Sequence, residues 1–289
     1  MRVTDPFVKS LRIFGIFAPA RKMKKHLIIL TFALSGMMAF SQTAEVGLFG
    51  GVSYYLGDIN PGIHFLASKP AYGVIARVNI DSRWVVKASA FKGKIKGDDR
   101  LGQTNDLRGL KFESKITDIS VTAEFNFFDY YTGSRRNILT PYIFGGIGMV
   151  FFNPMSDGIE LRSIGTEGQN VGFDGRKPYN LIAFSIPFGI GAKYSFSKRL
   201  CLSAEWGLRK SFTDYLDDVS ETYYLDGSQI NTTDPEEVLS DPTFRHKAYQ
   251  ERGNPSTNDW YNFTGISLTY KFRLFNKNKC PNQWKSKNS

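Results

Sequence analysis

The sequence predicts an all-β fold: an eight-stranded antiparallel transmembrane β-barrel of the outer membrane, with long outer loops and short periplasmic turns. Three observations predict it. Apolar and polar residues alternate along several segments, long and short connections alternate between these segments, and an export signal precedes them. A strand cannot cross lipid alone, because its unpaired backbone groups would lie in hydrocarbon, so such strands must close on each other.

The segment 181–196 has an apolar residue at every second position, which gives it one wholly apolar face over a length suited to a bilayer. A water-soluble barrel also alternates, but strand length, loop asymmetry and the export signal favour the membrane. Bacterial barrels have an even number of strands. The eight candidate strands lie at 44–56, 72–80, 84–93, 116–128, 140–152, 181–196, 200–212 and 261–275.

The connections between these segments alternate in length. Short links follow the second, fourth and sixth segments, at 81–82, 129–138 and 197–198, and long links rich in Gly, Asp and Asn follow the others. Short turns of such barrels face the periplasm, so both ends of the barrel are expected there. Aromatic residues at predicted strand ends would form interfacial girdles: Tyr54, Tyr55, Phe128, Tyr130, Tyr131, Phe151, Phe152, Trp260, Tyr261, Phe272 and Phe275.

The first 41 residues are expected to lie outside the barrel. Residues 23–41 combine a basic start, a short apolar run and Ala39-Phe40-Ser41, the pattern of a secretory signal peptide. An uncleaved membrane helix would need about 20 apolar residues. Residues 1–22 are interpreted as an over-extended gene start, 42–275 as the β-barrel and 276–289 as a basic periplasmic tail.

The net charge of +10 comes from the two ends of the chain. Seven of the 37 basic residues, but one of the 27 acidic residues, precede position 42, and four lysines follow position 275. The stretch between these positions is neutral, so no basic surface for a nucleic acid is predicted.

If the apolar face is turned toward lipid, charged residues of both signs face the lumen. The balanced signs predict a cross-linked polar interior that braces the barrel, because unpaired charges in a narrow interior would be costly. Passage of a small solute stays the alternative. The predicted lumen charge network is Arg77, Lys87, Asp118, Glu124, Lys193, Glu205, Arg209 and Lys271, with Arg273 on the same face.

Catalytic signals are weak. The two histidines of the mature chain, His64 and His246, fall in predicted outer loops without a metal-ligand spacing. No catalytic, cofactor-binding or metal-binding residues are predicted, although a catalytic set at the outer rim stays an open alternative. The acidic cluster of Asp214, Asp217, Asp218 and Glu221 lacks the ligand spacing of a calcium loop and is expected to be solvated.

The two cysteines are expected at the same rim of the barrel. Cys201 opens the seventh predicted strand and Cys280 follows the eighth, so a Cys201–Cys280 disulfide is predicted for the oxidising periplasm. Two free thiols are the alternative.

Several strings then resemble a known family. These are Tyr54 to Pro61, Glu124 to Phe128, Pro141 to Gly148, Thr213 to Ser220 and Gly253 to Trp260. In order along the mature chain, they resemble the DUF6089 family of Bacteroidota outer-membrane barrels, which includes the PorG-like barrel of the type IX secretion system. The resemblance implies a non-enzymatic structural or assembly subunit without cofactors. The implied partners are outer-membrane lipid and proteins of the periplasmic secretion ring.

Overall fold

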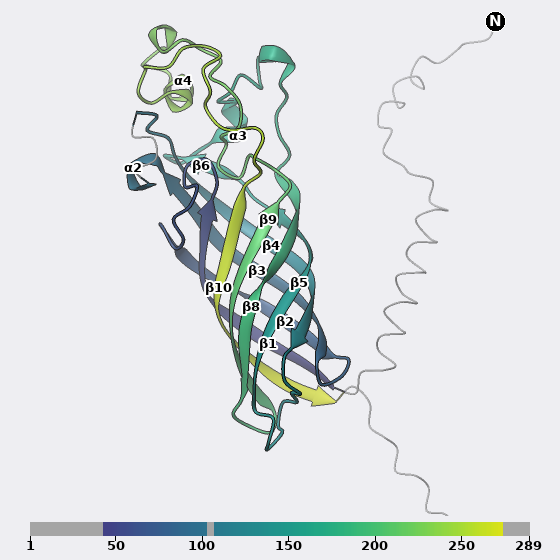
Figure 1. The fold of residues 1–289 in the computed structure, drawn as a ribbon. Helices are drawn as coiled ribbons and strands as arrows, with labels where there is room; N and C mark the ends of the chain where they lie inside the picture. Colours follow the sequence, from purple (N-terminus) through teal and green to yellow (C-terminus); the bar gives the residue numbers. More distant parts are fainter. Residues whose placement is uncertain (1–42, 103–106, 274–289) are drawn as a thin grey trace, which may run out of the picture. The chain divides into compact units, whose positions relative to one another are not determined.

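The structure is a computed structural model, and it describes residues 43–102 and 107–273. Eight long antiparallel strands form a closed ring, in which each strand pairs with the next along the chain and the last pairs with the first (Figure 1). The fold class predicted from the sequence is confirmed. The strands are β1 (Thr43–Leu56), β2 (Lys69–Asn79), β3 (Trp84–Asp98), β4 (Lys111–Asn126), β5 (Leu139–Phe151), β8 (Ile182–Ser195), β9 (Leu200–Ser211) and β10 (Trp260–Arg273).

The β3–β4 hairpin extends about five residues further outward than its sequence predicts. Its register runs without a break to the pair Asp98 and Lys111. The lysines in this extension resemble a loop by composition, yet they alternate with inward-facing residues such as Ile95 and Phe112, which are buried. The alternation of inward and outward residues therefore continues through this extension, although its outward lysines hide the pattern in the sequence.

The long connections contain short elements that the sequence did not reveal. A periodic pattern cannot be recognised in two to six residues. One of them, β6, adds to the edge of β4 through the pair Glu113 and Met155. These elements are α2 (Asp99–Gly102), β6 (Pro154–Ser156), β7 (Ile159–Glu160), α3 (Leu161–Ile164), η2 (Phe173–Gly175), η3 (Gly227–Gln229) and α4 (Pro235–Ser240).

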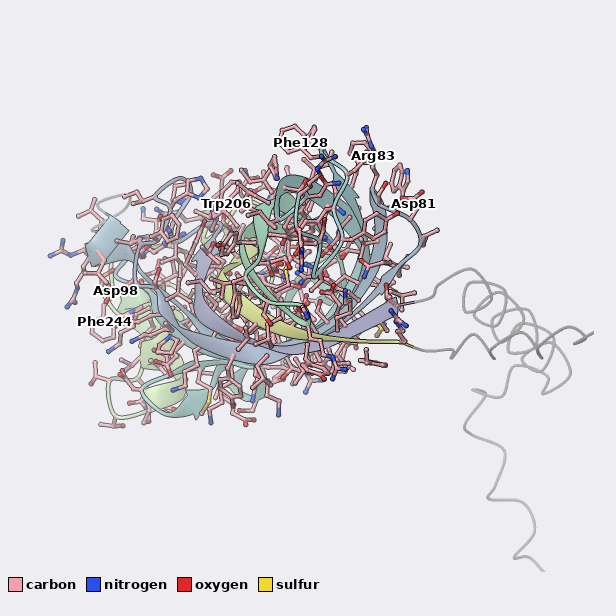
Figure 2. The ribbon with its side chains drawn as sticks, turned by 90° about the horizontal axis from the view of Figure 1, so that it is seen from below. Asp81, Arg83, Asp98, Phe128, Trp206 and Phe244 are labelled. Carbon is pink, nitrogen blue, oxygen red and sulfur yellow. The ribbon has the colours of Figure 1, made fainter. Side chains whose placement is uncertain are left out.

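Long and short connections lie at opposite ends of the barrel, as predicted. The helical elements gather at one end in Figure 1, and Figure 2 shows Asp81 and Arg83 of a short turn well apart from Asp98 and Phe244 of the long loops. Thr43 pairs with Arg273, so the two ends of the described barrel meet beside the short turns. The predicted gene start, signal peptide, basic tail and Phe275 lie outside the described residues.

The outward face of the wall is an apolar band. Along β8 the outward residues are all apolar, and the same parity holds in the middle of the other strands. No helix in the described part of the chain is long and apolar enough to span a membrane. Exposed side chains of the band include Val46, Leu48, Val74, Ile119, Val121, Ile143, Ile147, Phe184, Ile186, Ile190, Leu202, Ile266 and Leu268.

The interior is layered, which corrects two expectations. The predicted ionic lumen occupies only part of its length, and a hydrophobic core around Phe112, Ile116 and Val150 continues into the outer loops. The second correction concerns the aromatic girdles. Adjacent residues of a strand face opposite sides, so only one member of a pair such as Tyr54 and Tyr55 can face the lipid. Five of the expected girdle residues are fully buried or nearly so: Tyr54, Tyr55, Tyr130, Phe152 and Tyr261.

Candidate functional site: the sealed interior and the outer cap

Five charged side chains from five strands meet in the barrel interior. Glu124 lies 3.2 Å from Arg77 Nε, 3.4 Å from Lys87 Nζ and 2.6 Å from Lys193 Nζ. Glu205 lies 2.8 Å from Lys87 Nζ and 4.0 Å from Arg77 Nη2. None of these side chains is more than 2% exposed. Isolated charges would be very costly here, so each charge depends on the others.

Neutral groups surround this ionic cluster. The Tyr142 hydroxyl donates to Glu205 at 3.1 Å, and Lys193 donates to Asn126 at 3.0 Å. The Phe144 ring covers the Lys87 ammonium at 4.3 Å. That ring lies so close to Gly207 that a Cβ there would be 2.9 Å from Phe144 Cζ. Glycine is thus required where the ring fills the lumen.

A second ionic layer contains the predicted residues Asp118 and Arg209. Arg209 Nε lies 3.5 Å from Asp118 Oδ2, and Tyr261 donates to the same oxygen at 2.8 Å. The Arg209 guanidinium also stacks over Phe263, with its carbon 4.7 Å from the ring centroid. Asp118 and Arg209 therefore form a separate pair rather than extending the first cluster.

The short-turn mouth is closed by the connection between β4 and β5. Thr132 of this connection donates to Glu45 at 2.5 Å and accepts a hydrogen bond from Lys271. Lys271 therefore lies at the mouth and not in the ionic cluster, while Arg273 is exposed. Glu45 was not predicted from the sequence. It could have been, because it lies four residues before Phe49 on β1 and therefore faces the same side of the strand.

Cys201 is fully buried at this end and accepts a hydrogen bond from the Tyr130 hydroxyl at 3.0 Å. Its predicted partner Cys280 lies outside the described residues. The disulfide stays a prediction.

The outer end is closed by a cap in which strings distant in sequence converge. We define the cap as residues 57–68, 99–102, 107–110, 152–181 and 212–259. The Tyr55 hydroxyl at its base lies 2.5 Å from Asp217 Oδ2 and 2.8 Å from Asp259 Oδ1. One hydroxyl proton cannot serve two carboxylates. Burial raises the pKa of Asp217 and of Asp259 well above the usual range, and the charge of Asp217 adds to the shift of Asp259.

The expectation that the acidic cluster is solvated was wrong. Asp214, Asp217 and Asp218 are each at most 7% exposed, and Glu221 alone is more open. For Asp217 and Asp218, backbone N–H groups and distant hydroxyls take the place of water; for example, Val219 N donates to Asp217 Oδ1 at 2.9 Å, and the Tyr179 hydroxyl donates to Asp218. Among the described residues no group of acidic, histidine or cysteine side chains could hold a metal ion.

Arg108 joins three loops of the cap. Its guanidinium donates to both carboxylate oxygens of Asp99, at 2.6 and 2.9 Å, and to the backbone carbonyls of Asp58 and Arg252, at 2.9 and 2.6 Å. The Asp58 carboxylate in turn accepts from Asn254 N at 2.7 Å. A guanidinium that donates four hydrogen bonds in this way fixes geometry as well as charge.

Arg252 makes the second link in the cap. Its Nη1 lies 3.1 Å from Glu167 Oε1, and its Nη2 lies 3.7 Å from Asp218 Oδ2. Tyr179 and Thr166 also donate to Asp218. Burial raises the pKa of Asp218 to about 6 although Arg252 opposes the shift, and burial raises the pKa of Asp214 to about 8.

The two histidines occupy structural positions. His64 hydrogen-bonds the Tyr54 hydroxyl at 3.0 Å on the outer wall. His246 pairs with Asp241 at 2.9 Å, but its ring stacks on Tyr223 at 4.3 Å, and Asp241 also accepts from backbone N–H groups of its own loop. This histidine–aspartate pair therefore stabilises a turn. A cavity in the cap that reaches Asp217 and Arg252 has a volume of about 160 Å³, below the size of ordinary ligand pockets.

A closed ring of eight strands with an apolar outer wall and buried ion pairs is an outer-membrane β-barrel. The described wall contacts membrane lipid, as this class requires. The family model described as "Domain of unknown function (DUF6089)" matches residues 24–281, and the chain belongs to this family.

Solved outer-membrane barrels resemble the chain weakly. The N-terminal barrel domain of OprF from Pseudomonas aeruginosa is 13% identical, with 80% of this chain and 98% of that chain covered and a TM-score of 0.37. Ail of Yersinia pestis is 10% identical, with 80% and 99% covered and a TM-score of 0.40. Neisserial surface protein A is 10% identical, with 79% and 97% covered and a TM-score of 0.41. None of the curated proteins matches the chain.

Proposed function

We propose that this protein is a non-enzymatic structural barrel that serves as an assembly subunit of a secretion machine in the bacterial envelope. The observation that carries the proposal is the sealed interior. The ionic cluster, the apolar core and the two closed ends leave the barrel as a rigid membrane anchor. Such an anchor acts through the surfaces that it presents to other proteins.

The short-turn end offers such a surface. Arg135, Arg136 and Lys198 are exposed there and form no ion pair within the described ranges. Phe128 and Tyr131 are exposed beside them, at 60% and 52%. Exposed aromatics with arginines are characteristic of protein interfaces, and the charge favours an acidic partner. We infer a periplasmic protein as that partner.

The specific machine that we propose is the type IX secretion system, with a PorG-like role for this chain in a Bacteroidota cell. The family membership and the periplasmic surface support it. On this proposal the partner belongs to the periplasmic ring of the machine. The competing functions, a small-solute pore and a rim enzyme, have less support, because the lumen is filled and the histidines are used in packing.

Deleting the gene and assaying export of type IX cargo tests this function. We expect cargo to accumulate in the periplasm and export to return with the wild-type gene. Complementation with Arg135→Glu and Arg136→Glu should fail, while the matched outer-loop variant with Arg245→Glu and Lys247→Glu should restore export. Normal export in the deletion strain would contradict the proposal. Equal rescue by both variants would show that the basic turn is not the interface.

A further inference from the structure

A group of charged residues lies on the outward face of β3 and β4. On β3 the outward residues change from apolar to basic within a single row of paired residues, and on β4 they change through Thr117 to Lys115. Ala90 pairs with Val74 and Ile119, and the next row outward pairs Lys92 with Tyr72 and Thr117. On β5 and β8, by contrast, the outward residues stay apolar up to the last row. We define the lysine face as Lys92, Lys94, Lys96, Lys111 and Lys115.

The lysine face has more positive charge than the protein neutralises. Glu113 pairs with Lys94 at 2.7 Å, and Asp157 pairs with Lys111 at 2.8 Å. No ion pair within the described ranges involves Lys92, Lys96 or Lys115. In the register Lys96 lies opposite Glu113 and Lys111 lies opposite Asp98, but Lys94 and Lys115 lie directly opposite each other, an arrangement that is destabilising for like charges. An anion bound outside the wall would relieve this repulsion.

An apolar groove runs directly below the lysine face. It has a volume of about 640 Å³ and is lined almost wholly by apolar atoms of β1 to β4. Small side chains form its floor, with Ala76 opposite Ala88 and Ala90 one row outward, while the larger Leu48 and Val121 stand at its sides. Above it, a second hollow of about 640 Å³ is bordered by Tyr72 and the lysines.

We infer that this face binds a phosphorylated, anionic lipid of the outer leaflet, with the phosphates on the lysine face and an acyl chain in the groove. The charge and the groove support it independently. The lysines lie at the outer end of the strands, where lipid headgroups begin, and Lys92 and Lys96 are about 13 Å apart along β3. Tyr72 is 65% exposed in the boundary row, a position that amphipathic rings prefer.

The test uses the full chain, purified in detergent and titrated with bisphosphorylated lipid A. The variant carries Lys92→Gln, Lys96→Gln and Lys115→Gln. The matched control carries Lys177→Gln, Arg245→Gln and Lys247→Gln, which removes three exposed charges from the outer loops instead. Tryptophan fluorescence checks that every variant is folded.

We expect each lysine to contribute a factor of about five to the affinity at low salt. The variant that lacks three of them should therefore bind lipid A on the order of 100-fold more weakly. The control should bind like the wild type. Equal affinity of the lysine variant and the wild type would overturn the proposal, and so would an equal loss in the control.

Two further measurements distinguish binding of the lipid headgroup from binding of the acyl chain. Dephosphorylated lipid A should bind the wild type no more tightly than it binds the lysine variant. Ala90→Phe fills the groove and should weaken lipid A binding while leaving the lysines in place. If inorganic phosphate competes as well as lipid A, the site takes the free anion, and the assignment to a lipid is wrong. Full binding by Ala90→Phe would refute the acyl groove.

Discussion

Glu124→Gln removes the central charge of the ionic cluster while keeping the shape of the side chain. Glu124 lies within 3.4 Å of three cations, and neither it nor any of them is more than 2% exposed. The substitution would leave Arg77 and Lys87 with Glu205 as a remaining carboxylate, and it would leave Lys193 without the carboxylate with which it pairs. Breaking a buried ion pair by removing one partner costs about 3–5 kcal/mol, so the free energy of unfolding should fall by about that amount.

Glu113→Gln is the matched control, because it makes the same chemical change on the outward face of the same strand. Glu113 pairs with Lys94 at 2.7 Å, but the two side chains are 41% and 46% exposed. Exposed pairs contribute about 0–1 kcal/mol. Urea unfolding of both variants in lipid vesicles, followed by tryptophan fluorescence, gives the comparison. A loss in Glu124→Gln no larger than that in Glu113→Gln would refute a stabilising role for the interior network.

Three further predictions concern the cap and the packing of the lumen. The pKa of Asp214 is raised to about 8 and that of Asp218 to about 6, so their stabilisation of the folded cap falls as pH rises from about 4 to 8. Proteolysis of the 212–259 loop should be faster at pH 8 than at pH 6, and Asp214→Asn should reduce this difference; slower cleavage at pH 8 would contradict the sign. Gly207→Val would press on Phe144 and should lower the free energy of unfolding in urea by about 1–3 kcal/mol, whereas an unchanged value would mean that the lumen has spare room. Arg108→Met leaves buried Asp99 unpaired and should speed hydrogen exchange in the cap but not in the barrel strands, with partial rescue by Asp99→Asn; unchanged exchange in the cap would argue against the link between its loops.

Period-two alternation was enough to predict the barrel and the inward parity of its charges. Seven of the eight predicted network residues are buried in the lumen because each lies on a strand whose other face is apolar. The sequence could not show that these residues divide into the ionic cluster and the separate pair of Asp118 and Arg209. Which residues meet across the lumen depends on the stagger of the strands around the ring. Lys271 has the inward parity but lies at the mouth, where solvent reaches it.

The cap was the part that the sequence concealed. Loops have no periodicity, and composition alone favoured solvation for the acidic cluster. The contacts that bury Asp217 and Asp259 come from Tyr55, which is 162 and 204 residues away from them. The strings that carried the family resemblance were nevertheless a usable signal, because three of them meet at this place.

Planar-bilayer recording on the reconstituted full chain shows whether the ionic interior of the barrel is sealed at both ends. A sealed barrel should give no discrete conductance steps above those of protein-free membranes. Regular steps from the intact protein would contradict a sealed interior and favour a solute pore.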